Sequence, residues 1–106
     1  MIFAKITRHN AFFYEMLQKN PESMVEPLKA HCELLKKWKE EGKYLGGWYF
    51  PGDGRSVHIF DFKDESDMDN SFFEDPMNDT FEIELLAGVP IFEHIENALS
   101  NKLEEK

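Results

Sequence analysis

Histidine is the residue of this sequence best suited to acid/base chemistry near neutral pH, because the unperturbed imidazole titrates there. The chain has four of them, His9, His31, His58 and His94. None stands at a paired metal-binding spacing such as His-x-x-x-His, and a single cysteine excludes every multi-cysteine metal site. We therefore expect no metal ion and no intrachain disulfide. Cys32 is expected to be a small apolar residue on a buried helix face.

His31 lies on the apolar face of an expected helix. Leu28, His31, Leu35 and Trp38 fall at helical spacing and share one face, with Cys32 at its flank. The imidazole should therefore point toward the interior of the domain rather than toward water. There it would either move a substrate proton or fill a structural role with its polar atoms satisfied by a neighbouring group.

His58 is the second candidate, because it falls in an expected strand over residues 57–62. Strand alternation groups it with Lys5 and Glu84 on one face of the sheet. Together with the aromatic residues Trp48 and Tyr49, these side chains would line a small-molecule site. The plainer alternative is a sheet face half open to water, in which Lys5 pairs with a glutamate of the neighbouring strand and the aromatic residues belong to the core.

Hydrophobic periodicity predicts the elements that position these residues. In order, they are a strand over 2–7, one or two helical turns before Asn20-Pro21, a helix over 24–41, a strand over 44–50, a turn over 51–55, a strand over 57–62, a short helix from 64 or 66 to about 74, a strand over 81–87 and a tail helix over 91–103. Gly46-Gly47 favours a bulge or a close backbone approach. Asp75-Pro76 ends the short helix, because the residue before proline is pushed out of the helical region.

The order β-α-β-β-α-β is that of a ferredoxin-like α+β fold with an antiparallel sheet and, here, an extra C-terminal helix. Right-handed crossovers place both helices on one face of the sheet. We expect that face to carry Ile2, Ala4, Ile6, Val57, Ile59, Phe81, Ile83 and Leu85. The opposite face then holds Lys5, His58 and Glu84 among aromatic side chains. A second copy of the chain would enclose it as a partly polar cavity.

Length and charge bound the function. Residues 1–106 suffice for one domain, with residues 100–106 expected to fray. A net charge of -9 repels phosphate groups, so neither nucleic acid nor an anionic membrane is expected as a partner. The absence of a long apolar segment predicts a cytoplasmic protein without a membrane span. A domain this small buries a modest core, which favours a homodimer or a higher homo-oligomer.

Three segments resemble known families. LKAHCELLKKWKEEGKYLGGWYF (28–50) resembles the first helix and second strand of the YCII-related domains, and FFEDPM (72–77) resembles their second helix, which ends in Asp-Pro. FEIELLAGVPIF (81–92) is similar to the last strand of the muconolactone isomerase-like proteins. Together these segments cover most of residues 24–92. Both families belong to the dimeric α-β barrel superfamily, so the resemblance implies that fold and a homodimer.

The resemblance also implies an active-site pair. YCII-related proteins combine a helix histidine with the aspartate of Asp-Pro, and the matching positions are His31 and Asp75. The sequence departs from the pattern in lacking a glycine shortly after Asp-Pro and in a longer segment over residues 11–22, so the shape of the pocket and the substrate need not be shared. An aspartate before proline is also a common way to end a helix, which leaves a structural alternative for Asp75.

The resemblance implies a cofactor-independent enzyme of the isomerase, lyase or dehalogenase type, and we expect it to act on a small cyclic or carboxylated metabolite. His31 would be the general acid/base and Asp75 would fix its tautomer, with Trp48, Tyr49 and His58 near the pocket. The alternative is a non-catalytic homodimer that binds a small molecule.

Overall fold

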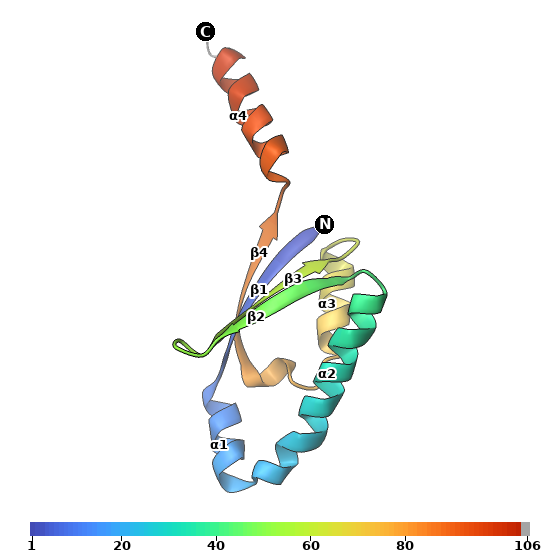
Figure 1. The fold of residues 1–106 in the computed structure, drawn as a ribbon, viewed down its shortest axis with the longest axis vertical. Coiled ribbons are helices and arrows are strands. Elements are labelled where there is room, and N and C mark those ends of the chain that lie inside the picture. The colour runs from blue at the N-terminus through green and yellow to red at the C-terminus, as the bar shows by residue number, and fades with distance from the viewer. Residues whose placement is uncertain (105–106) are drawn as a thin grey trace.

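The chain adopts the expected α+β fold with βαββαβ order and an added C-terminal helix (Figure 1). The computed structural model describes residues 1–104. Its four strands are β1 (Ile2–His9), β2 (Tyr44–Phe50), β3 (Arg55–Asp61) and β4 (Phe81–Gly88), which form one antiparallel sheet in the order β2-β3-β1-β4. The helices are α1 (Ala11–Lys19), α2 (Val25–Glu40), α3 (Glu65–Phe73) and α4 (Ile91–Glu104), with 3-10 turns over Pro21–Met24 and Asn78–Thr80.

Local sequence chemistry fixes where these elements begin and end. Asn10 caps α1 by accepting a hydrogen bond from the amide of Phe13, and Asp64 caps α3 by accepting one from Asp67. Gly42, with φ of +76°, follows the end of α2 in the left-handed conformation that favours glycine. The predicted bulge in β2 is confirmed, since the pairing of β2 with β3 shifts between Tyr44 and Gly46.

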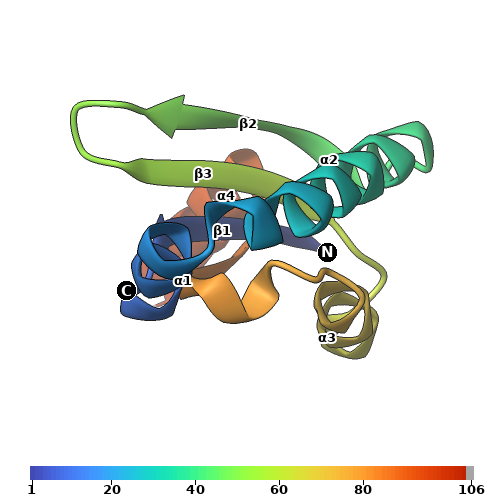
Figure 2. The same cartoon turned by 90° about the horizontal axis from the view of Figure 1, so that it is seen from below.

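Helices α2 and α3 pack on the same face of the sheet (Figure 2), as the crossover rule predicts. The core between them and the sheet is largely aromatic, and its buried members are Phe3, Trp38, Phe60, Phe62, Met68 and Phe72. Trp38 on α2 and Phe72 on α3 both contact the ring of Phe60 on β3, at centroid distances of 5.9 and 5.2 Å. The sheet face under the helices is therefore built from phenylalanine rather than from aliphatic residues.

This aromatic face overturns the predicted alternation of β1 and β3. Phe3, Lys5 and Thr7 are buried against the helices, and Lys5 lies opposite His58 in the register, so His58 shares that face. The residues expected there, Ile2, Ala4, Ile6, Val57 and Ile59, lie on the open face instead. The prediction for β4 is correct, since Leu85 pairs with Lys5 and Glu84 pairs with Ile6 on the open face.

The physical reason is that the larger aromatic side chains bury more area against two helices than the aliphatic row would. The lysine in the same row is tolerated because its ammonium lies 4.0 Å from the centroid of the Phe72 ring. Strand alternation alone therefore identified two rows of residues on β1 and β3 but assigned them to the wrong faces.

A second, smaller cluster lies beside the main core. Phe13 on α1, Met24 and Met77 are buried together, with Met16 and Phe81 packed against them. Met77 is fully buried and follows directly after Asp75-Pro76. The cluster therefore anchors the chain segment that connects α3 to β4, which is the segment that carries Asp75.

Helix α4 extends away from the rest of the molecule beyond the end of β4 (Figure 1). All of residues 91–101 are exposed. The helix runs to Glu104, whereas residues 105 and 106 lie outside the described part of the chain, so fraying there stays a prediction. Within residues 1–104, none of the helices has the length and apolar character that a membrane crossing requires.

Cys32 is a further correction, because its side chain is exposed on α2 rather than buried. Leu28, on the same predicted apolar face, is also 42% exposed. The apolar face of α2 is therefore covered by the sheet only toward its C-terminal end, where Trp38 is 2% exposed.

Candidate acid/base site

The structure brings His31 and Asp75 into direct contact across 44 residues of sequence. His31 lies near the middle of α2, and Asp75 lies two residues after the end of α3. The His31 Nδ1 and Asp75 Oδ2 atoms are 2.6 Å apart. An ionised carboxylate only accepts hydrogen bonds, so His31 Nδ1–H donates, and the neutral ring carries its free lone pair on Nε2. The His31 side chain keeps 18% of its exposure, whereas that of Asp75 keeps 2%.

The Asp75 carboxylate is held on both oxygens. Its Oδ1 accepts a hydrogen bond of 2.9 Å from the backbone amide of Met77, and its Oδ2 accepts from His31. Burial by itself would raise the pKa of Asp75, but the hydrogen bonds from His31 and Met77, with the nearby charge of Lys5, lower it below its ordinary value of 3.8. The carboxylate is therefore ionised at neutral pH and holds the imidazole in one orientation.

Lys5 reaches the same region from β1. It is 3% exposed, and its Nζ lies 4.0 Å from the ring centroid of Phe72 and 6.0 Å from that of Phe81. Burial lowers the pKa of Lys5 to about 8, against the opposing effect of the Asp75 charge. The sequence interpretation grouped Lys5 with Glu84 on the open face; the structure instead places its ammonium on the helix-covered face.

His58 lies opposite Lys5 in the pairing of β1 with β3, on the same covered face. Its Nδ1 shares a hydrogen bond of 2.8 Å with the hydroxyl of Tyr44. Burial, reinforced by the charge of Lys5, lowers the pKa of His58 to about 4, and burial raises the pKa of Tyr44. Both side chains are therefore neutral at pH 7. Gly47 makes room for this pair, since a Cβ there would clash with Tyr44 Oη and lie 2.8 Å from His58 Nδ1.

The structure does not bring the other predicted site residues to this place. Glu84 lies on the open face of the sheet, opposite Ile6. Trp48 and Tyr49 occupy the edge strand β2, where they are 63% and 62% exposed. Alternation directs them to opposite faces, with Trp48 on the open face and Tyr49 on the helix side.

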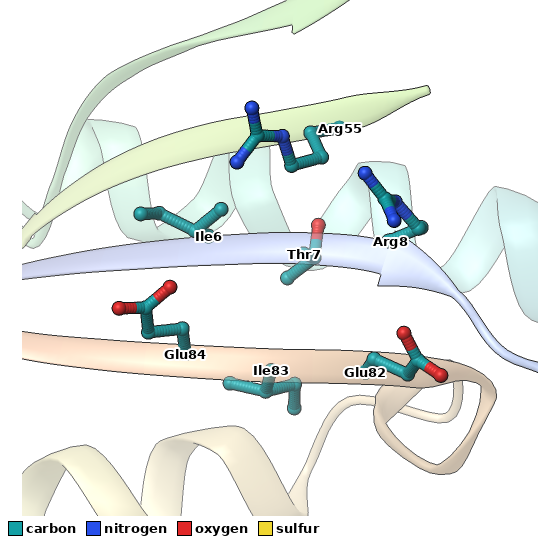
Figure 3. Close-up of a pocket in the computed structure, with 7 residues that line it drawn as sticks. All are labelled: Ile6, Thr7, Arg8, Arg55, Glu82, Ile83 and Glu84. Carbon is teal, nitrogen blue, oxygen red and sulfur yellow. The ribbon is translucent and has the colours of Figure 1, made fainter. Parts of the chain in front are cut away.

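The open face has a polar hollow of its own, of about 240 Å³. Figure 3 shows the guanidinium groups of Arg8 and Arg55 on β1 and β3 and the carboxylates of Glu82 and Glu84 on β4. A neighbouring hollow of about 320 Å³ is lined by Ile6, Phe50, Asp53, Arg55 and Val57. Asp53 forms ion pairs with both arginines. These hollows are separate from the His31–Asp75 pair, which lies beneath the helices.

Several residues around the pair were not singled out by the sequence. Phe81 lies 5.8 Å from the His31 ring, and His9 stacks between Phe13 and Phe81 at 3.7 and 5.2 Å. Burial lowers the pKa of His9, helped by the charge of His31. His9 lies four residues after Lys5 on β1, so strand alternation puts both on one face. Assigning that face to the helices would have predicted that His9 lies near His31. Tyr44 carries no comparable signal, because its partner is set by the β2–β3 register.

No protein-family model matches the sequence, and no curated protein matches it. Among solved structures, the chain is similar to the 5-chloro-2-hydroxyhydroquinone dehydrochlorinase of Burkholderia phenoliruptrix AC1100 in its complex with 2,5-dihydroxybenzoquinone. The TM-score is 0.61 at 16% sequence identity, and the match covers 84% of this chain and 94% of the other. At this identity the likeness concerns the fold alone, which in this chain is a ferredoxin-like α+β architecture with the antiparallel sheet order β2-β3-β1-β4.

Proposed function

We propose that this protein is a cofactor-independent enzyme of the isomerase, lyase or dehalogenase type, in which His31 moves a proton of a small cyclic or carboxylated metabolite. The observation that carries the proposal is the 2.6 Å contact between His31 Nδ1 and the buried Asp75 carboxylate. It leaves Nε2 as a base of defined orientation. The similarity in fold to a dehydrochlorinase in complex with the cyclic compound 2,5-dihydroxybenzoquinone agrees with this class of reaction.

The chemistry requires only proton transfer. His31 Nε2 accepts a proton from a C–H or O–H bond of the substrate, and the electron pair of that bond stays on the substrate. In an isomerisation the resulting anion takes the proton back at another atom, whereas in an elimination the electron pair forms a double bond and expels a leaving group. Asp75 stabilises the imidazolium that forms in either case. The remaining exposure of His31 allows its proton to exchange with water.

The proposal is tested with a panel of small carboxylates, lactones and chlorinated hydroxyquinols, by following deuterium uptake from D2O and chloride release. His31→Gln and Asp75→Asn should each lower turnover by about 10²- to 10⁴-fold, the usual contribution of a general acid/base. His94→Gln on the exposed helix α4 is the matched control and should leave turnover unchanged. Turnover by His31→Gln at the level of the unsubstituted protein would contradict the proposal.

A non-catalytic binding function is the second candidate, favoured by the hollow on the open face. Its charged lining of Arg8, Arg55, Glu82 and Glu84 does not include the His31–Asp75 pair. If this is the functional site, titration with the same panel should shift backbone amide resonances around Arg55 and leave those around His31 unmoved. No turnover should accompany that binding.

We also propose that a second copy of the chain covers the open face. This face exposes the large apolar side chains Trp48 and Phe50 on β2 and Leu86 on β4, at 63%, 48% and 51%, and exposed apolar surface marks interaction sites. Sedimentation at micromolar concentration should give at least a dimer. Val57→Glu on the open face should dissociate it, whereas Phe73→Glu on the exposed side of α3 should not. A monomeric unsubstituted protein at tens of micromolar would refute the proposal.

A further inference from the structure

Lys5 is a buried cation whose charge has no direct partner. Its side chain is 3% exposed, yet among the side chains that the structure describes, those of residues 1–101, its Nζ has neither a hydrogen-bond acceptor nor a carboxylate at ion-pair distance. Burying a charged group without compensation is unfavourable, and proteins normally pair such groups. The unmatched ammonium therefore points to a ligand that supplies the missing negative charge.

The surroundings of Nζ do not supply that charge. The ammonium lies over Phe72 at 4.0 Å, with Phe81 at 6.0 Å. Aromatic faces attract a cation but accept no full hydrogen bond, so they replace its hydration only in part. Asp75 is close enough to affect the titration of Lys5, but its oxygens accept from His31 and from the amide of Met77 and form no direct contact with the ammonium.

The same two phenylalanines connect Lys5 to the acid/base pair. The Phe81 ring lies 5.8 Å from the His31 ring, and the backbone carbonyl of Phe72 accepts a hydrogen bond of 3.1 Å from the amide of Asp75. Lys5 and His31 are therefore neighbours of one aromatic surface, the first as a cation and the second as a base. A flat ring lying on that surface could contact both groups.

We propose that Lys5 binds an anionic oxygen of the substrate, a carboxylate, enolate or phenolate on a small ring, and so places an adjacent C–H or O–H bond at His31 Nε2. The assignment rests on the proposed acid/base role of His31. When His31 removes the proton, the electron pair moves toward the ring oxygen, and the ammonium stabilises the negative charge that develops there. Lys5 thus restricts the substrates to small cyclic compounds with an ionised oxygen.

The test uses 2,5-dihydroxybenzoquinone, whose acidic hydroxyls are ionised at neutral pH, and hydroquinone, a neutral ring of the same size. Lys5→Met should weaken binding of the anion by about 10- to 100-fold, the range for a hydrogen bond to a charged group, and should leave hydroquinone binding within about twofold. Lys19→Met, on the exposed ion pair with Glu15, is the matched control and should change neither affinity. Equal binding of the anion by Lys5→Met and the unsubstituted protein would overturn the proposal, as would an equal loss of both ligands.

A second measurement avoids any dependence on how Lys5→Met folds. In the unsubstituted protein, the ¹³Cε resonance of Lys5 should titrate near its lowered pKa of about 8, and millimolar 2,5-dihydroxybenzoquinone should move that midpoint upward, because a bound anion favours the charged amine. An unmoved midpoint refutes the subsite.

The two proposals can also fail separately. Anion binding that depends on Lys5, combined with full turnover by His31→Gln, would refute the acid/base function and keep the subsite. Turnover that is lost in His31→Gln but unchanged in Lys5→Met would keep the acid/base function and refute the anion subsite at Lys5.

Discussion

Replacing Asp75 by asparagine tests the central interaction of the site with minimal change in shape. The amide oxygen of the new side chain can still accept the hydrogen bond from Met77, but its NH2 group would face His31 Nδ1–H, and two donors cannot bond to each other. His31 should therefore lose its partner or move its proton to Nε2. In the second case Nε2 becomes a donor and can no longer act as a base.

The magnitude follows from the chemistry of the contact. A hydrogen bond to a charged group contributes about 1.5–3 kcal/mol to stability, and Asp75 is buried, so little of this is lost to screening by solvent. Removal of the carboxylate also leaves the buried Lys5 with less electrostatic compensation. We expect the free energy of unfolding to fall by about 2 kcal/mol, which lowers Tm by roughly 8–16 °C for a domain of this size.

The free energy of unfolding that Asp75→Asn loses should depend on pH. The pKa of Asp75 is lower in the folded chain than its ordinary value of 3.8, so the unfolded chain binds this proton more readily. The stabilisation is therefore complete above 3.8 and is lost as the pH falls through the lower folded pKa. The difference between the unsubstituted protein and Asp75→Asn should be present at pH 7 and should shrink below pH 3.8.

Urea unfolding followed by the fluorescence of the buried Trp38 measures the stability, and ¹⁵N NMR of the imidazole reports the tautomer. Asp79→Asn is the matched control, because it removes one negative charge from an exposed residue of the same segment. If Asp75→Asn unfolds at the same urea concentration as Asp79→Asn and His31 keeps its tautomer, the carboxylate does not hold the ring and the reasoning is wrong.

Three further predictions concern the surroundings of the site. Gly47→Ala should lower the free energy of unfolding by about 1–3 kcal/mol in urea titrations, since its Cβ would lie 2.8 Å from His58 Nδ1. The control Gly52→Ala should change it by less than about 0.5 kcal/mol, because no atom lies within 4 Å of the Cβ there. The free energy of unfolding of the unsubstituted protein relative to Lys5→Met should rise between pH 8 and 10.5, because the folded chain releases the Lys5 proton first; a flat difference would contradict the lowered pKa. Deletion of residues 91–106 should leave the urea midpoint of the monomer unchanged, because residues 91–101 are all exposed, and a loss above about 1 kcal/mol would show that α4 packs on the domain.

The sequence alone determined the features that depend on neighbours along the chain. The cap at Asp64, the end of α3 before Asp75-Pro76 and the bulge beside Gly46 follow from local backbone preferences and short-range hydrogen bonds. The order of strands and helices then restricts the topology to a few arrangements. The position of His31 on the inward side of a helix also follows from the sequence alone, because helical spacing fixes which residues share a face.

Only the tertiary structure decided which face of the sheet meets the helices. Period-2 alternation separates Ile6 from Lys5 but does not say which row is buried, and a lysine was assigned to the more polar face. The cost of burying it is offset only in part, by Phe72 from α3 and the charge of Asp75, which approach the ammonium in the folded chain. These groups are 67 and 70 residues from Lys5 along the chain.

The same holds for the two hydrogen-bonded pairs that define the site. The distance between His31 and Asp75 depends on how α2 and the end of α3 pack over the sheet, and a family resemblance suggested the pair before packing could be known. The contact between Tyr44 and His58 depends on a register that the bulge shifts by one residue. Long-range packing sets both distances, and no local pattern of residue types encodes them.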